Sequence, residues 1–276
     1  MTITNIATKS MPFKCPFCFY TRSWGIRRNK RKCKKCKKEF SSKIYIVKKI
    51  RSTEKEWKNC IKIFLRERTI KRIVEETNIP HCRVEYMVQH FRNCMMNDLP
   101  IKFEGPIEMD ETYIGGQRKN KCLHIRRIKA KRGHGTDKLP IMGIFDRSTG
   151  TVHVEVMKQK LSMKCILEIL NKRVASNSKI YTDGFKMYRM LPKYGYTHEY
   201  VDHLQNEYVR GEIHTNNIEG FWGILKRKLG CIGGMRRNCL HLFVAEIVWN
   251  FNHRNMQIYD REKELFKLIQ KTTFGG

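Results

Sequence analysis

The order of strand-like and helix-like segments after residue 100 constrains the fold of this chain more than any other feature. Residues 106–114, 139–145 and 151–156 each predict a strand, and the third alternates apolar and polar side chains with a period of two. A helix from Met163 to about Val174 follows, with Ser162 as its N-terminal cap. This part of the chain therefore begins as consecutive strands with a helix to cover them.

Strands and helices alternate through the rest of the chain. Residues 179–182 predict a fourth strand, Tyr200-Val201 belong to a fifth, and Phe185–Met190 between them predicts a short helix. Two helices close the domain, at about 216–229 and 240–255. Three strands followed by alternating helices and strands is the order of a ribonuclease-H-like fold, a mixed α/β sheet with helices on both faces.

Composition separates two smaller blocks from this domain. Residues 11–42 are rich in Cys and Lys and poor in aliphatic residues, and residues 52–97 have helical periodicity. Pro100 and Gly105-Pro106 mark the start of the third block, which we take as residues 100–276. We therefore expect two small modules in front of one full-size domain.

Four of the eleven cysteines form two C-x-x-C pairs, Cys15 with Cys18 and Cys33 with Cys36. Each pair can direct two thiolates at one tetrahedral ion, and residues 19–32 can form the hairpin that brings the pairs together. Four unrelated cysteines in a basic tail is the alternative, but the paired spacing disfavours it. Since this block is too small and polar to have a core of its own, we predict a zinc ribbon folded around structural Zn²⁺.

The charge of the chain indicates a polyanionic partner. Lys and Arg number 56 against 26 Asp and Glu, a formal net charge of +30. Self-repulsion at such a charge is relieved when the cations neutralise phosphates and release counterions. Residues 27–38 and 118–132 hold nine and eight basic residues and no acidic one, although each run could also be a solvated face. Because the chain has no long apolar span, we expect double-stranded DNA as the partner and not a membrane.

The second block predicts two short helices joined by a tight turn. Ile70, Ile73 and Val74 form one apolar stripe, and a break at Thr77–Pro80 follows it. A second stripe consists of Val84, Met87, Val88 and Phe91. Four polar side chains accompany this second stripe: Arg83, Gln89, His90 and Arg92. The arrangement fits a DNA-reading helix-turn-helix, and plain helical packing is the alternative.

Three acidic residues lie where a ribonuclease-H-like sheet places a metal site. In such a sheet the first carboxylate is on the central first strand, the second follows the fourth strand, and the third lies on a later helix. Asp110, Asp183 and Glu219 occupy these places. Acidic side chains that converge on Mg²⁺ from separate elements are what two-metal phosphodiester chemistry requires. The alternative is that Glu219, with Lys226 two helical turns further on, is an ordinary exposed charge.

Two neighbours of these residues are left out of the predicted site. Glu108 shares a strand face with Asp110, so it is a possible decoy for the first carboxylate. His214 is more typical of a structural or DNA-facing histidine than of a catalytic base.

Several motifs resemble those of one family of transposases. They are MDETYIGG at 109–116, YTDGF at 181–185, HTNNIEGFW at 214–222 with Lys226-Arg227 after it, and NFNHR at 250–254. Each is weak alone, but together they resemble the ISXO-type insertion-sequence transposases, which are related to the eukaryotic Merlin elements. The resemblance covers nearly the whole chain, since members of that family also carry a zinc ribbon before the catalytic domain.

The resemblance implies a DDE transposase in which Asp110, Asp183 and Glu219 bind Mg²⁺ or Mn²⁺. Lys226 would then assist at the active site. One subgroup of these enzymes uses asparagine as the third residue, which leaves the asparagines at 216–217 as alternatives to Glu219. We favour Glu219, because a carboxylate binds Mg²⁺ better than a neutral amide does.

The sequence thus predicts an enzyme that binds the terminal inverted repeats of its element and catalyses Mg²⁺-dependent DNA cleavage and strand transfer. Two ends must be joined in one complex, so we expect a homodimer there. A catalytically silent copy retained as a DNA-binding regulator is the alternative, and a generic ribonuclease-H-like nuclease is a third function. Because Met1–Asn5 opens no export signal, we expect an intracellular protein, nuclear in a eukaryotic host and in the cytoplasm or nucleoid of a bacterial one.

Overall fold

The computed structural model describes most of the chain, in these ranges: 15, 17–18, 20–26, 30–41, 50, 52–98, 102–116, 122–127, 138–157, 160–176, 178–202, 209–232 and 236–274. Residues 27–29 of the first predicted basic run, and 118–121 and 128–132 of the second, lie outside these ranges. By its contacts the chain divides into two compact units, residues 1–87 with 273–276 and residues 88–272. None of the described helices is long and apolar enough to cross a membrane.

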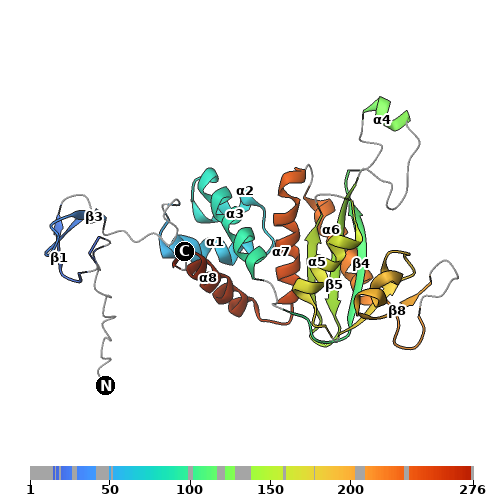
Figure 1. Ribbon diagram of the computed structural model, residues 1–276. Coiled ribbons are helices and arrows are strands. Elements are labelled where there is room, and N and C mark those ends of the chain that lie inside the picture. Colours follow the sequence, from blue (N-terminus) through green and yellow to red (C-terminus); the bar gives the residue numbers. More distant parts are fainter. Residues whose placement is uncertain are drawn as a thin grey trace, which may run out of the picture. The chain divides into compact units, whose positions relative to one another are not determined.

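The first unit contains a small antiparallel sheet. Strands β1 (Ser23–Ile26), β2 (Lys30–Cys33) and β3 (Glu39–Ser41) pair in their chain order, and Figure 1 shows them as a compact group. The register places Cys33, at the end of β2, opposite Ser23, at the start of β1. Since Cys18 comes shortly before β1 and Cys36 shortly after β2, this pairing brings both cysteine pairs to one end of the sheet.

Three helices follow this sheet in the chain: α1 (Glu54–Phe64), α2 (Ile70–Thr77) and α3 (His81–Asn97). α1 begins with a capping box, in which the side chains of Thr53 and Glu56 each accept a hydrogen bond from the other's backbone N–H. α2 ends at Asn78, whose left-handed backbone (φ 55°) turns the chain into α3. Ile73 and Met87 are fully buried, and the structure therefore has two helices with buried apolar faces where the sequence predicted them.

The second unit is built on a five-stranded sheet. Its strands are β4 (Ile107–Ile114), β5 (Leu139–Asp146), β6 (Thr151–Val156), β7 (Lys179–Asp183) and β8 (Thr197–Val201), in the order β6-β5-β4-β7-β8. β4, β5 and β6 pair antiparallel, whereas β7 runs parallel to β4 and β8 runs parallel to β7. A central first strand flanked by the second and the fourth is the order of the ribonuclease-H-like fold, so the predicted fold class is confirmed.

Helices cover both faces of this sheet (Figure 1). α5 (Met163–Arg173) and the 3₁₀ helix η3 (Tyr188–Tyr194) lie in the core on one face, and α6 (Asn216–Cys231) and α7 (Leu240–Asn252) lie in the core on the other. Side chains of β4 alternate between the two cores. Ile107 and Met109 belong to the α5 core, and the two acidic residues Glu108 and Asp110 therefore point toward α6.

Three details of the predicted elements differ from the structure. The short helix expected at Phe185–Met190 is η3, which begins at Tyr188. β8 begins at Thr197, three residues before the predicted Tyr200-Val201 pair. The chain also has further helices that the sequence patterns did not predict: α4 (Leu123–Arg127), the 3₁₀ helix η5 (Arg237–Cys239) and α8 (Ile258–Phe274).

Strand β6 lies at an edge of the sheet, and a side chain from α7 occupies part of that edge. The backbone N–H of Val152 donates a 2.8 Å hydrogen bond to Asn252 Oδ1, and Asn252 Nδ2 donates one of 2.9 Å to the carbonyl of Val152. The amide thus takes both hydrogen bonds that a further strand would make at this residue.

Two arginines of α3, Arg83 and Arg92, form ion pairs with carboxylates of other helices. Arg83 Nη1 lies 3.3 Å from Glu56 Oε1, and Arg92 Nε lies 2.6 Å from Glu246 Oε2 on α7. The guanidinium of Arg92 also lies over the ring of Phe243. Both arginines thus neutralise partly buried carboxylates, and DNA reading by α3 stays a prediction.

Candidate active site and metal centre

Asp110 and Asp183 lie next to each other in the middle of the five-stranded sheet. β4 and β7 are neighbouring parallel strands, in which Glu108 pairs with Tyr181. Asp110 and Asp183 each lie two residues further along their strand, so they are level with each other. Residues that are level on parallel strands point to the same face of the sheet. The negative charge of Asp183 raises the pKa of Asp110, so the two groups interact electrostatically. The structure therefore brings together two acidic residues that are far apart in the sequence.

The surroundings of Asp110 disfavour its negative charge. Burial raises the pKa of this carboxyl most, and the charges of Glu111 and Asp183 raise it further, to about 8. Burial also raises the pKa of Glu111, to about 7, with the charge of Asp183 adding to the effect and a hydrogen bond from Tyr188 opposing it. A divalent cation among these oxygens would offset the repulsion. The oxygen-only donor set fits Mg²⁺ or Mn²⁺.

Trp222 connects the helix α6 directly to Asp110. Its Nε1 donates a hydrogen bond of 2.9 Å to Asp110 Oδ2. The ring reaches the sheet because residue 143, opposite Asp110 on β5, is a glycine. A Cβ atom on Gly143 would lie 2.6 Å from Cη2 of Trp222, so any larger residue would push the indole away. Lys226 lies one turn beyond Trp222 on α6 and is exposed.

Glu219 is exposed on α6, one turn before Trp222. Its Oε1 accepts a 2.7 Å hydrogen bond from Oγ1 of Thr215, the residue before the helix. Within the described ranges, only the four N-terminal cysteines bring three or more metal-ligating atoms within 4.8 Å of one another. Asp110, Asp183 and Glu219 therefore do not form such a group, and the structure brings together two of the three predicted carboxylates.

Glu108 is a fully buried anchor for the start of α6. Its Oε2 accepts hydrogen bonds from the backbone N–H groups of Asn217 (2.9 Å) and Ile218 (3.0 Å), and its Oε1 accepts one from Asn217 Nδ2 (2.7 Å). A carboxylate at this place satisfies N–H groups that have no partner within the helix and interacts favourably with the helix dipole. Glu108 lies two residues before Asp110, and Asn217 lies two residues before Glu219. The side chain of Asn217, one of the two alternatives for the third site residue, is turned to this anchor.

Arg147 neutralises Glu108 and ties three segments together. Its Nε donates a 2.7 Å hydrogen bond to Glu108 Oε1, and its Nη1 and Nη2 donate to the carbonyls of Glu212 (2.6 Å) and His214 (2.7 Å). The guanidinium also lies over the ring of Tyr181 on β7. His214 Nδ1 is 3.3 Å from Glu108 Oε1, so this histidine belongs to the anchor.

Sequence reasoning did not select Glu111, which follows Asp110 and shares its electrostatic environment. Strand alternation turns Glu111 to the opposite face from Asp110. There its Oε2 accepts a hydrogen bond from the hydroxyl of Tyr188, which is fully buried in η3. The adjacent acidic pair was visible in the sequence, but its buried tyrosine partner lies 77 residues away in the chain.

The four cysteines of the first unit form a compact cluster with the geometry of a single metal site. Cys15 Sγ lies 3.5 Å from Cys36 Sγ, and Cys18 Sγ lies 3.5 Å from Cys33 Sγ. Burial raises the pKa of the Cys33 thiol, but hydrogen bonds from the backbone N–H groups of Cys36 and Lys35 outweigh this and bring its pKa to about 6. Four sulfur ligands of which one readily becomes a thiolate fit structural Zn²⁺.

Comparison with known proteins gives a consistent result for the sequence. Residues 102–252 match the ISXO2-like transposase domain. The chain is 30% identical over 250 residues to an uncharacterized protein in transposable element ISH50 of Halobacterium salinarum, which covers 87% of this chain and 83% of the relative. It is 27% identical to an uncharacterized transposase-like protein of Haemophilus influenzae over 92 residues, or 33% of this chain and 74% of that protein.

Similarity to solved structures is low. The catalytic core domain of the HTLV-2 integrase, in complex with magnesium, is 15% identical with a TM-score of 0.30. The match covers 55% of this chain and 86% of the integrase chain. The fold assignment consequently depends on the strand order of the sheet.

Proposed function

The chain belongs to the ISXO2-like transposase family, and from this premise we propose that it binds the terminal inverted repeats of a mobile element and catalyses metal-dependent DNA cleavage and strand transfer. The observation that carries this proposal is the pairing of Asp110 with Asp183 on neighbouring parallel strands. A buried carboxyl with two further carboxyls nearby is costly unless a cation is present, so this arrangement supports a metal site.

In this proposal Asp110, Asp183 and Glu219 hold Mg²⁺ or Mn²⁺. A metal held there would supply activation of the attacking water or hydroxyl and stabilisation of the leaving oxygen of the phosphodiester. We propose that Glu219 joins the other two carboxylates when the metal binds; its side chain is exposed and accepts a hydrogen bond from the neutral hydroxyl of Thr215. Lys226 lies on the same helix with its side chain exposed, which suits a contact with a DNA phosphate.

The other residues of the site keep the carboxylates in place. Trp222 fixes the orientation of Asp110 by its hydrogen bond to Oδ2. Glu108 and Arg147 fix the first turn of α6, which carries Glu219. Positioning of this kind matters for phosphoryl transfer, because misplacing a catalytic group by about 1 Å costs about a hundredfold in rate.

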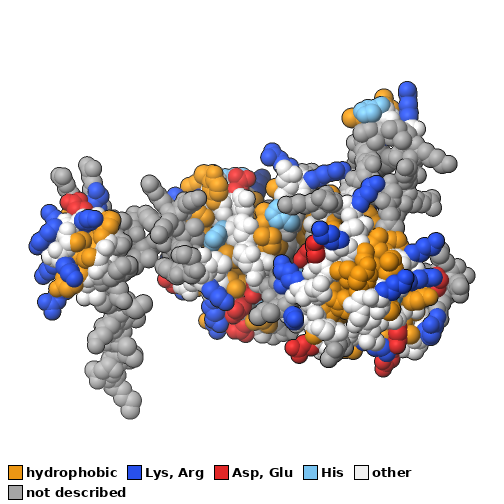
Figure 2. Space-filling view, viewed as in Figure 1, with side chains coloured by type: hydrophobic (Ala, Val, Ile, Leu, Met, Phe, Trp, Pro, Cys, Tyr) orange, Lys and Arg blue, Asp and Glu red, His pale blue; other side chains and the backbone are white. Residues whose placement is uncertain are grey.

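The remaining modules supply DNA binding in this proposal. Four cysteines would hold Zn²⁺ and make a ribbon whose second strand and turn are rich in Lys and Arg. Blue Lys and Arg side chains outnumber red acidic ones on the face shown in Figure 2, in line with the net charge of +30. We propose double-stranded DNA as the substrate and a homodimer as the form that joins two ends, with the nucleus or nucleoid as its place of action.

A cleavage assay tests the proposal. Double-stranded DNA that carries the element's ends is incubated with the full-length protein and Mg²⁺, and nicks and strand-transfer products are resolved on sequencing gels. Asp183→Asn should abolish both kinds of product and leave the affinity for the end DNA within a few fold. Equal cleavage by wild type and Asp183→Asn would overturn the assignment of the carboxylates. Nicks without strand transfer would indicate a simple nuclease.

A DNA-binding regulator without catalysis is the second candidate. One observation favours it, which is that the three predicted carboxylates do not lie within 4.8 Å of one another. Specific binding to the end DNA with no product at any Mg²⁺ or Mn²⁺ concentration would support this function.

A further inference from the structure

The peptide group between Gly184 and Phe185 holds the side chain of Asp183 in place. Asp183 is the last residue of β7, and the backbone N–H of Phe185 donates a 3.1 Å hydrogen bond to its Oδ1. This bond fixes the orientation of the carboxylate only as long as the peptide group keeps its own orientation. The contacts of that peptide group therefore matter for Asp183.

Arg189 of η3 holds the other side of the same peptide group. Its Nε donates a 3.1 Å hydrogen bond to the carbonyl of Gly184. A trans peptide group is planar and its C=O and N–H point in opposite directions, so a donor at the carbonyl also fixes where the N–H of Phe185 points. A cationic donor at the carbonyl polarises the group as well, which strengthens the N–H as a donor. Arg189 thus acts on the carboxylate of Asp183 through one peptide group.

Asp202 and Tyr200 hold the guanidinium of Arg189 in turn. Its Nη2 donates a 2.9 Å hydrogen bond to Oδ2 of Asp202, the residue after β8. The guanidinium also lies over the ring of Tyr200 on β8, with its carbon 4.6 Å from the ring centre. The side chain of Asp202 is only 16% exposed, so water screens this ion pair less than it screens a surface pair. The planar fork of Arg189 therefore serves two acceptors in one fixed position.

Gly184 allows these groups to come this close. A Cβ atom at this position would lie 3.0 Å from Oδ1 of Asp202 and 3.3 Å from Nη2 of Arg189, both closer than ordinary van der Waals contact. A larger residue would consequently push the ion pair away from the peptide group. The segment that follows Asp183 is thus tightly packed against η3 and the end of β8.

We propose that Arg189 is a positioning residue for the metal ligand Asp183, and that Asp202 holds Arg189 in this role. The guanidinium orients the peptide group after Gly184, and the N–H of Phe185 orients the carboxylate for a divalent cation. This role rests on the proposed function, because it presupposes a cation at Asp183.

The sign of the effect on metal affinity separates positioning from charge. Arg189 is a cation close to a site that would bind a cation, so by charge alone its loss would tighten metal binding. Loss of a contact that orients a metal ligand has the opposite effect and commonly weakens binding by about ten- to a hundredfold.

Mn²⁺ binding tests this role independently of DNA cleavage. The full-length, zinc-loaded protein is titrated with Mn²⁺, and electron paramagnetic resonance measures the free ion. The site at Asp183 is the one that Asp183→Asn no longer fills. We expect Arg189→Gln to weaken binding at this site about ten- to a hundredfold. Arg189→Lys keeps the charge but not the fork, and it should weaken binding too. Unchanged or tighter binding by the folded Arg189→Gln protein would overturn the proposal.

A double variant tests the part of Asp202. Asp202→Asn should weaken Mn²⁺ binding, but the loss of its negative charge alone would do so as well. If Asp202 acts by holding Arg189, then adding Arg189→Gln to Asp202→Asn should cause little further loss. Losses that add up fully would overturn the role of Asp202.

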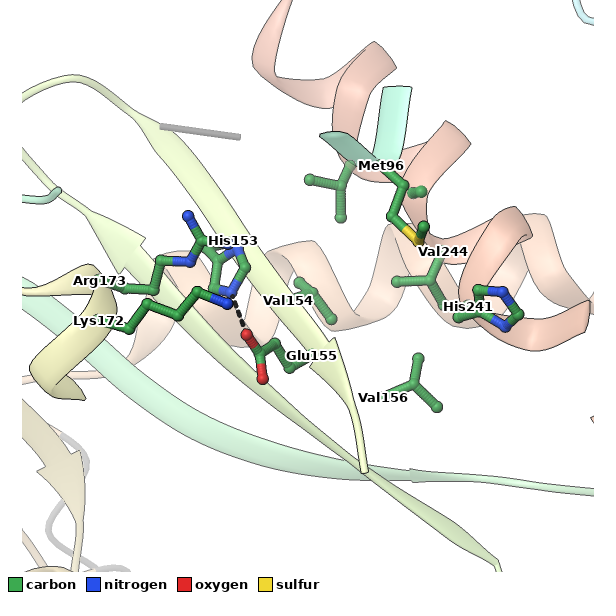
Figure 3. A pocket seen from close by; sticks show the side chains of 11 residues that line it. Met96, His153, Val154, Glu155, Val156, Lys172, Arg173, His241 and Val244 are labelled. Carbon is green, nitrogen blue, oxygen red and sulfur yellow. Dashed lines mark hydrogen bonds and ion pairs between the residues drawn. The ribbon is translucent and has the colours of Figure 1, made fainter. Parts of the chain in front are cut away.

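Two lysines provide controls for the loss of a positive charge. Lys193 is exposed and lies on η3, as Arg189 does. Lys172 lies beside a cavity of about 280 Å³ at the β6 edge of the sheet, and Figure 3 shows it near His153 and Glu155. Lys193→Gln and Lys172→Gln should not weaken Mn²⁺ binding. Weakening by either as large as that of Arg189→Gln would show a general charge effect and contradict the assignment.

The variant Asp183→Asn distinguishes failure of this role from failure of the proposed function. If it bound Mn²⁺ as the wild type does, there would be no cation site at Asp183, and both proposals would be wrong. If Asp183→Asn lost the ion while Arg189→Gln kept it at full affinity, only the role of Arg189 would be wrong.

Discussion

The indole Nε1 of Trp222 donates a hydrogen bond of 2.9 Å to Oδ2 of Asp110, and so links the helix α6 to the central strand of the sheet. This bond also lowers the pKa of Asp110, against the burial and the neighbouring charges that raise it. The helix that carries Glu219 and the strand that carries Asp110 therefore have one fixed contact at the site itself.

Trp222→Phe should reduce catalysis more than it reduces stability. Phenylalanine keeps an aromatic ring in the core but removes the donor to Asp110. A hydrogen bond to a charged group contributes about 1.5–3 kcal/mol, so the cleavage rate of the folded protein should fall roughly tenfold to a hundredfold. Rates are measured on end-containing DNA at saturating Mg²⁺.

Trp249→Phe is the matched control for this variant. Trp249 Nε1 donates a 2.8 Å hydrogen bond to Asp98 Oδ2, which is the same chemistry on α7. Its loss should lower the melting temperature without changing the cleavage rate per folded molecule. If both variants slowed cleavage equally, the contact of Trp222 with Asp110 would have no special part in catalysis.

Gly143→Ala should destabilise the protein by about 1–3 kcal/mol, because overpacking a filled core forces its neighbours to move. The added Cβ would lie 2.6 Å from the Trp222 ring. Gly223→Ala, on the exposed side of α6, meets nothing within 4 Å and should stabilise the helix by up to about 1 kcal/mol. Urea unfolding measures both. A neutral Gly143→Ala would mean that the indole can shift without cost.

Glu108→Gln should cost about 3 kcal/mol of unfolding free energy, since it leaves Arg147 without its buried counter-charge. Because Gln has nearly the same size as Glu, the lost stability comes from the missing charge and not from a change in side-chain volume. Glu199→Gln removes a half-exposed partner of Lys179 and should change stability by less than about 1 kcal/mol. Chemical denaturation of the two variants measures both unfolding free energies. Similar losses in the two variants would contradict the role of Glu108 as an anchor for α6.

The zinc content of the purified protein should depend only on the four clustered cysteines. We expect one Zn²⁺ per chain in the purified protein, and none in Cys33→Ser, which removes a buried ligand. Cys82→Ser changes an exposed cysteine of α3 and should keep the metal. Atomic emission on dialysed protein counts the ion. Retention of zinc by Cys33→Ser would contradict the predicted site.

The fold was predictable because the sequence features that indicate its strands and helices each lie within a short segment. Strand alternation in Thr151–Val156 and the cap at Ser162 each act within a few residues, and the structure has β6 and α5 at these places. The C-x-x-C spacing likewise identified the cysteine cluster, because the short backbone segment within each pair already holds the two thiols close together.

Contacts across the sheet were not predictable in the same way. The period of a strand tells which face a side chain takes but not what it meets there. Glu108 was taken as a possible decoy for Asp110. Its partners are the backbone N–H groups of Asn217 and Ile218, which lie 109 and 110 positions further along the chain. The space that Gly143 leaves for Trp222 likewise depends on the register between β4 and β5, which no single segment encodes.

The amide of Asn252, which takes both hydrogen bonds of Val152, limits how two copies of this protein can meet. Many proteins dimerise by joining their outer strands into one continuous sheet across a twofold axis. Here such a merger along β6 would first have to displace Asn252. This edge of the sheet is thereby disfavoured as a place where a second copy adds its strands.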